Sequence, residues 1–141
     1  MIIKNSKWTV LPVIALMTGA TATVSAQDGA SALSLPASEF APMQRFDVNY
    51  EEPEDMAEFY VQTLGLSVRD AEYEEGRNPR NRKHKVVIAT VEGIDDPKVN
   101  AVQWRLELKA EGGGWEAVSA GLRRKCQNGP NTNQWTRDVC P

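Results

Sequence analysis

The chain has 141 residues, a formal net charge of −3 and two cysteines, and a quarter of its residues are charged. This length favours one domain with its own core rather than two. The mild acidity argues against general binding to nucleic acid. The single histidine, His84, excludes a metal site built on a pair of histidines.

Residues 1–26 have the features of a cleavable signal peptide. Lys4 and Lys7 make the start positive, an apolar run follows, and small residues lead up to Ala26. We predict cleavage before Gln27, because the apolar run is about half of the roughly 20 residues that a spanning helix needs. An uncleaved anchor is the alternative. Cleavage removes both lysines, brings no lipid-anchored cysteine to the new end, and predicts a soluble protein in the periplasm or fully secreted.

The segment after the cleavage site is rich in Ala, Ser, Gly and Pro. We interpret residues 27–41 as a flexible leader to a single domain over residues 42–141. Residues 43–50 then alternate loosely, with Phe46, Val48 and Tyr50 on one side, which predicts a short strand.

Residues 53–64 give the strongest helix signal. Pro53 suits the first helical turn, and the two acids after it suit the positive end of the helix dipole. Gly65 suits a left-handed residue just past the end. Four apolar side chains recur at helical spacing and predict packing in the core rather than a ligand site: Met56, Phe59, Tyr60 and Leu64.

Two hairpins follow the helix. Residues 66–74, with one slip in register, and residues 83–91 form the first, with acids on one arm facing basic residues on the other. Residues 101–109 and 115–122 form the second around three glycines.

The strand over residues 101–109 alternates cleanly between the two faces of the sheet. The inward side chains are Val102, Trp104, Leu106 and Leu108, and the outward ones are Gln103, Arg105, Glu107 and Lys109. One apolar face requires a single cover, and the helix is available for it. The expected fold is therefore α+β, a curved antiparallel sheet of four to five strands packed on one main helix.

Both cysteines lie near the end of the chain. In an exported protein Cys126 and Cys140 predict a structural disulfide, which closes a C-terminal loop and is worth about 3 kcal/mol by the chain-entropy model. Two free thiols are the alternative, and the spacing lacks the Cys-x-x-Cys pattern of redox sites.

No residue is predicted to be catalytic, to bind a cofactor or to bind a metal. Ser119 has no Gly-x-Ser-x-Gly context. We expect His84, between two lysines, to be solvated. Gly112–Gly114 leads into a strand and not a helix, so it is a turn rather than a phosphate cradle.

The most distinctive surface feature is a run of five cations within nine residues: Arg77, Arg80, Arg82, Lys83 and Lys85. This run either docks an anionic partner or is a solvated turn whose charges balance the neighbouring acids. A second basic cluster, Arg123–Lys125, would favour docking if it lay beside the first. Trp104, Trp115 and Trp135 are core residues by default, and lining for a pocket at the mouth of the sheet is the alternative.

Two stretches resemble known families. Residues 106–118, a strand, a glycine turn and a strand led by Trp115, resemble the hairpin of cystatin-like and nuclear-transport-factor-like α+β folds. That resemblance implies a cone-shaped sheet around a helix, used for small-ligand pockets, inhibition or dimerisation. The end of the chain, with Cys126, Trp135 and Cys140, looks like those of small uncharacterised exported bacterial proteins.

The helical stretch over residues 56–66 looks like the helix of glyoxalase-type proteins. Those proteins carry two such modules and a metal held by His, Gln and Glu. Here only Gln44 stands near a ligand position and a second helix is missing, so we interpret the stretch as an ordinary amphipathic helix.

We predict a non-catalytic exported binding or accessory protein whose partner is an envelope protein or an anionic envelope polymer. A homodimer through the sheet stays open. The alternative is a small-ligand-binding protein or minor enzyme with a pocket between helix and sheet.

Overall fold

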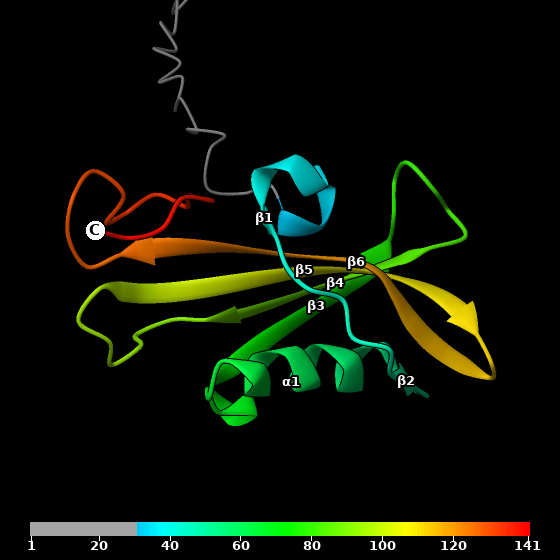
Figure 1. Ribbon diagram of the computed structural model, residues 1–141. Helices are drawn as coiled ribbons and strands as arrows, with labels where there is room; N and C mark the ends of the chain where they lie inside the picture. The colour runs from blue at the N-terminus through cyan, green and yellow to red at the C-terminus, as the bar shows by residue number, and fades with distance from the viewer. Residues whose placement is uncertain (1–30) are drawn as a thin grey trace, which may run out of the picture.

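The computed structural model describes residues 31–141, so the predicted signal peptide and the first residues of the predicted leader lie outside the described residues. One α-helix packs on an antiparallel sheet in the strand order β1-β6-β5-β4-β3, and β2 also pairs with β6 (Figure 1). The elements in chain order are η1 (Ala32–Ser34), η2 (Ala37–Glu39), β1 (Ala41–Pro42), β2 (Asn49–Tyr50), α1 (Pro53–Thr63), η3 (Val68–Asp70), β3 (Ala71–Arg77), β4 (Lys85–Val91), β5 (Val99–Glu111) and β6 (Gly114–Cys126). The predicted α+β class is confirmed, and within the described residues the sheet has six strands instead of the predicted four to five.

Helix α1 forms where the sequence predicted it and ends one residue earlier. Pro53 opens the helix, and Gly65 takes the left-handed conformation, with φ of +72°, just past its end. Met56 and Tyr60 are fully buried, as predicted. Leu64, however, is 46 % exposed and Phe59 is only half-buried, whereas Ala57 and Val61 are fully buried. The helix ends before Leu64 can turn toward the sheet.

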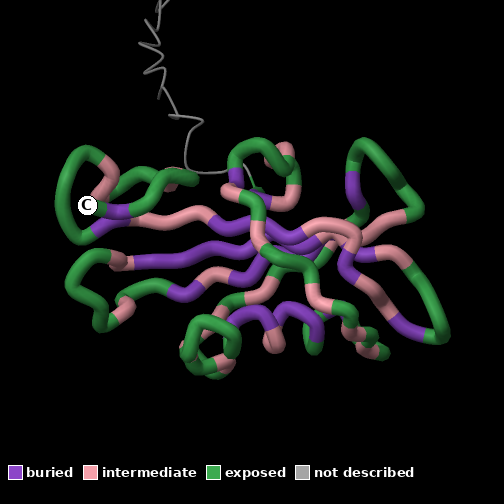
Figure 2. The backbone as a smooth tube through the Cα atoms, viewed as in Figure 1, coloured by how far each residue is buried: buried purple, intermediate pink, exposed green. Residues whose placement is uncertain are grey.

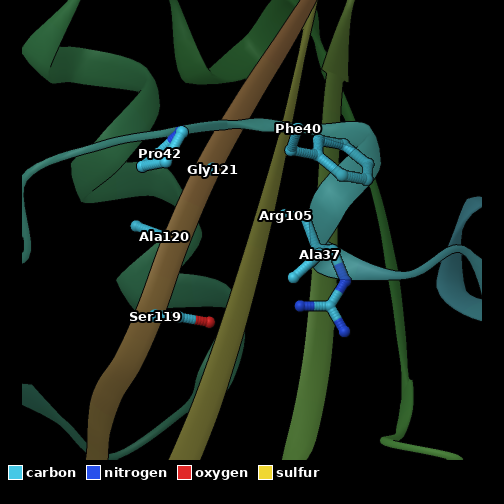
Figure 3. Close-up of a pocket in the computed structure, with 7 residues that line it drawn as sticks. All are labelled: Ala37, Phe40, Pro42, Arg105, Ser119, Ala120 and Gly121. Atoms are coloured by element: carbon cyan, nitrogen blue, oxygen red, sulfur yellow. The ribbon is translucent and has the colours of Figure 1, made fainter. Parts of the chain in front are cut away.

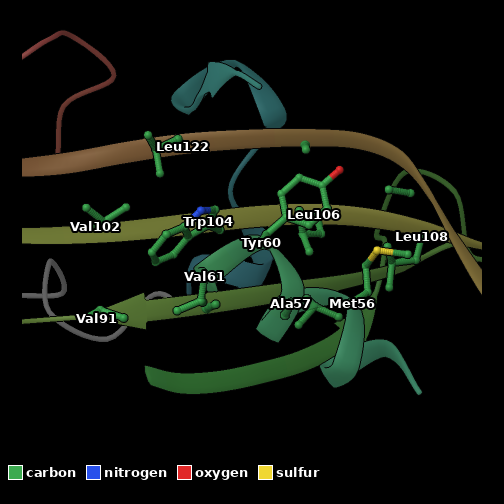
Figure 4. Close-up of a cluster of buried hydrophobic side chains, with 14 residues drawn as sticks. Met56, Ala57, Tyr60, Val61, Val91, Val102, Trp104, Leu106, Leu108 and Leu122 are labelled. Atoms are coloured by element: carbon green, nitrogen blue, oxygen red, sulfur yellow. The ribbon is translucent and has the colours of Figure 1, made fainter. Parts of the chain in front are cut away.

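The core lies between α1 and the sheet. The predicted inward side chains of β5, Trp104 and Leu106 among them, meet Met56, Tyr60 and Val61 of the helix (Figure 4). Burial of a large apolar side chain stabilises a fold by about 1.5–3 kcal/mol, so this layer dominates the stability. The Nε1 of Trp104 lies in it without a hydrogen-bond partner.

The opposite face of the sheet, which we call the outer face, departs from the prediction. Gln103 and Arg105 were expected to face solvent, yet both are buried. A second apolar cluster lies on this face and includes Phe40, Val86 and Ile88. Because β4 is apolar on both faces, its outer side chains also require a cover, and the segment before β1 provides it (Figure 2).

That segment was predicted to be a flexible leader, which is wrong for residues 31–41. Phe40 is 2 % exposed, and Leu33 lies against Gly76 of β3. The chain crosses β6 so closely at Gly121 that a Cβ there would lie 2.7 Å from the Cβ of Phe40. A few apolar residues among small ones are sufficient to anchor it.

The strand predicted over residues 43–50 is also corrected. Only its last two residues pair, as β2, and β1 precedes it. Between them Phe46 turns to the helix, where its ring meets Phe59 edge-on with centroids 5.2 Å apart. Backbone carbonyls along the edge of β6 still accept hydrogen bonds here: Met43 N–H donates to the Ala120 carbonyl, and the Arg45 side chain donates to the Ala117 carbonyl.

The first hairpin differs from the prediction in the residue where it starts and in its register. The predicted slip is a short helix, η3, so β3 begins at Ala71 and not at residue 66. Acids and bases do not face each other: Arg77 lies opposite Lys85, and Glu74 lies opposite Ile88. The only ion pair between these arms joins Lys85 to Glu75. A register fixed by the apolar side chains of β4 decides which charges meet.

Candidate functional site

The five cations singled out in the sequence lie in and beside the β3–β4 connection, which we call the basic turn (Arg77–Lys85). The turn is ordered by its own backbone: Asn78 N–H donates to the His84 carbonyl, and Arg80 N–H donates to Asn78 Oδ1 at 2.9 Å. Within residues 31–141, only Lys85 of the five makes an ion pair. The other four, Arg77, Arg80, Arg82 and Lys83, are exposed and make none. The neighbouring acids therefore leave most of this charge unbalanced.

The second basic cluster, Arg123–Lys125, does not adjoin the basic turn. Arg123 pairs across the sheet with Gln103, and Gln103 pairs with Thr90. Thr90 is five residues along β4 from Lys85, which is about 16 Å at roughly 3.3 Å per residue. Figure 1 shows the β3–β4 connection and the C-terminal loop at opposite ends of the sheet. The two clusters do not form one surface.

Cations of this second cluster are in contact with other side chains of the fold. Arg123 Nε donates to Gln103 Oε1 at 2.7 Å, and its guanidinium lies over the rings of Phe40 and Trp135. Lys125 lies over Trp135 as well and pairs with Glu92 at 3.4 Å. Half-burial lowers the pKa of Arg123, although Glu39 opposes that shift. These contacts are structural in character.

The three tryptophans do not line a common pocket. Trp104 is fully buried in the core, and Trp115 lies at the β5–β6 turn under the Lys85 ammonium. Trp135 is half-buried and packs on Arg123 and Lys125. Between the helix and the sheet, core side chains of both pack together.

The predicted disulfide is confirmed. Cys126 and Cys140 are bonded and buried, with their Cα atoms 5.4 Å apart. The closed loop also pairs with the sheet, because Arg124 and Thr136 exchange two backbone hydrogen bonds. The loop thus holds Trp135 against β6.

His84 is not the solvated residue that the sequence predicted. It is half-buried, and its Nδ1 lies 2.7 Å from Glu107 Oε1. Glu107 projects from β5 toward the start of β4, which the sequence pattern alone does not reveal. Ser119 is the partner of Glu107 on the other side, on β6.

This arrangement has the wrong order for a nucleophilic triad. A catalytic histidine must stand between the serine and the acid. Here the acid Glu107, on β5, separates His84 next to β4 from Ser119 on β6. Residues 31–141 also bring together no group of three His, Cys, Asp or Glu side chains that could hold a metal ion.

Arg105 is the functional candidate that the sequence reasoning missed. It is 3 % exposed and lines a cavity of about 130 Å³ on the outer face, between β6 and the segment before β1 (Figure 3). Burial lowers the pKa of its guanidinium; the charge of Glu107 opposes this shift and that of Arg80 adds to it. The sequence signal that could have revealed its burial is the apolar pattern of β4 on both faces, which implies that a second segment covers the outer face.

Comparison of the chain with family models, with curated proteins and with solved structures finds no match. The resemblance to cystatin-like and nuclear-transport-factor-like folds therefore stays a prediction. Within residues 31–141, no helix has the length and apolar character needed to cross a membrane.

Proposed function

We propose that the chain is a non-catalytic exported binding protein that docks an anionic partner of the cell envelope through the basic turn. The observation that carries this proposal is the set of four exposed cations without an ion pair in the described part of the chain. Like charges held together on an ordered turn attract an anionic surface and speed its encounter.

Export is supported by the Cys126–Cys140 disulfide, because such bonds persist in oxidising compartments and are rare in the cytosol. The test is expression of the full chain in a bacterium, followed by fractionation and N-terminal sequencing. We expect the mature chain outside the cytoplasm, beginning at Gln27. A chain that stays in the cytoplasm with its first residues intact would contradict export.

Docking is tested by charge reversal. Arg82→Glu with Lys83→Glu should weaken binding by about 2 kcal/mol or more, because each basic residue near an anionic surface contributes about 1 kcal/mol. The matched control is Arg69→Glu with Lys98→Glu, two exposed cations elsewhere that make no ion pair within residues 31–141. Binding is measured to lipopolysaccharide and, separately, to poly-glutamate as a substitute for an acidic protein face.

The proposal is supported if binding to either probe weakens as salt is added and if the basic-turn variant, but not the control variant, loses it. The probe that binds more tightly identifies the partner class. Equal binding by both double variants, or no binding to either probe, contradicts it. A non-catalytic role is further supported by the order of Ser119, Glu107 and His84 across the sheet.

A further inference from the structure

The cavity beside Arg105 is distinct from the basic turn and lies on the face of the sheet opposite α1. Within residues 31–141, the Nε of Arg105 is a buried donor without an acceptor from the chain. A buried charge is costly unless it is paired and hydrogen-bonded. A guanidinium holds its donors in a fixed fork. When it is buried and one donor lacks an acceptor, it is suited to bind an incoming anion.

Glu107 pairs with the charge of Arg105 but does not accept from its Nε. Its Oε2 lies 3.7 Å from Arg105 Nη1, which is beyond a hydrogen bond. Its other oxygen, Oε1, is occupied by His84 at 2.7 Å. The carboxylate therefore compensates part of the charge of Arg105 and leaves its Nε donor unused.

The walls of the cavity define the rest of the ligand. Arg105 and the Ser119 hydroxyl are its polar side chains, and the remainder is apolar or backbone: Ala37, Phe40, Pro42, Ala120 and Gly121. Pockets for drug-sized ligands occupy about 300–1,000 Å³. A cavity of about 130 Å³ fits a small group instead.

We propose that this cavity binds a carboxylate that carries a short apolar substituent. A carboxylate matches the planar fork of a guanidinium with two parallel hydrogen bonds. A phosphate dianion fits poorly, since one arginine beside Glu107 leaves too little positive charge for it. The substituent packs on Phe40 and Pro42. The charge of Arg80 adds to the positive potential at Arg105.

The experiment is titration of the full-length mature protein with butyrate, butyramide and inorganic phosphate, followed by calorimetry and by chemical shifts of assigned amides. We expect saturable binding of butyrate with shifts at Ser119 and Gly121, and none for butyramide. A tetrapeptide with a free terminal carboxylate and its amide form a second pair. If butyrate binds alone, the source is a free acid; if the peptide acid also binds, a protein terminus is a source as well.

Two variants locate the site. Arg105→Met should weaken butyrate binding by about tenfold or more, because a hydrogen bond to a charged group is lost. Its midpoint of unfolding without ligand should equal or exceed that of the wild type, since an apolar side chain removes a poorly compensated charge. Ser119→Leu keeps Arg105 and fills the cavity, and should weaken binding as well.

Arg82→Glu with Lys83→Glu should leave butyrate binding within about twofold, which separates this site from docking through the turn. Butyrate binding that survives Arg105→Met, equal binding of phosphate, or no binding of any carboxylate would overturn the proposal. Loss of docking through the basic turn would not overturn it, because that experiment uses different residues and probes.

Discussion

The chain carries two basic regions of similar composition that have opposite environments. The cations of Arg123 and Lys125 lie over aromatic rings and beside polar or acidic partners, whereas four of the five in the basic turn have no ionic partner in the described part of the chain. The difference arises from what covers each region. Phe40 and Trp135 of the disulfide loop lie against Arg123, and Trp135 also lies against Lys125. Position in the fold, not local charge, decides which cluster is available for binding.

The largest test of this comparison removes the cover from Arg123. Phe40→Ala should lower the free energy of unfolding by about 3–5 kcal/mol, because a fully buried ring leaves a cavity. Urea denaturation measures the change, and Ser38→Ala, an exposed position in the same segment, is the control and should stay within about 0.5 kcal/mol. A flexible leader would give no difference between the two variants.

Next in size is the disulfide that holds Trp135 over the second cluster. Cys126→Ser with Cys140→Ser should reduce stability by about 3 kcal/mol, since the unfolded chain regains the freedom of the closed loop. Denaturation should show the loss of stability, and quenching of tryptophan fluorescence should show the release of Trp135. Unchanged quenching would mean that the aromatic contacts hold the loop without the bond.

The two clusters can be compared directly by equal changes of charge. Arg123→Ala should cost about 1–2 kcal/mol, because it removes a hydrogen bond and two ring contacts. Arg82→Ala should stay within about 0.5 kcal/mol. Thermal unfolding of both variants measures the contrast. Similar costs at the two positions would contradict the structural role assigned to Arg123.

The smallest effect concerns Tyr73, on the helix side of β3. Burial first, and then Glu58 and Glu54 of the helix, raise the pKa of its phenol from 10.0 to about 12. The folded state therefore retains this proton after the unfolded state has lost it. Stability should be unaffected by this group below pH 10 and should fall between pH 10 and about 12. Absorbance at alkaline pH should show two late phenols, Tyr73 and the buried Tyr60, whose pKa burial also raises. Tyr73→Phe should remove one of the two and reduce the fall in stability; a phenol at 73 that titrates near 10 would contradict this prediction.

Local pattern was sufficient for much of the fold. Pro53 and Gly65 bounded the helix, and alternation in β5 placed Trp104 and Leu106 in the core. The cysteine pair predicted its own bond. These features depend on residues near one another in the chain, where backbone geometry and periodicity act directly.

The candidate sites divide in the same way. The basic turn was visible as a run of cations, because glycine, proline and asparagine beside them mark a connection. Whether its charges were balanced depended on register, and the structure pairs Arg77 with Lys85 instead of with an acid. The contact of His84 with Glu107 depended on the neighbouring strand in the same way.

Arg105 marks the limit of what the sequence determined. Alternation placed it on the face away from the helix, and it lies there. Alternation cannot say whether a distant segment covers that face. The cover comes from residues more than sixty positions earlier, whose few apolar side chains show no periodic pattern. Only tertiary packing, with the close crossing at Gly121, turned a predicted surface arginine into the buried charge of a cavity.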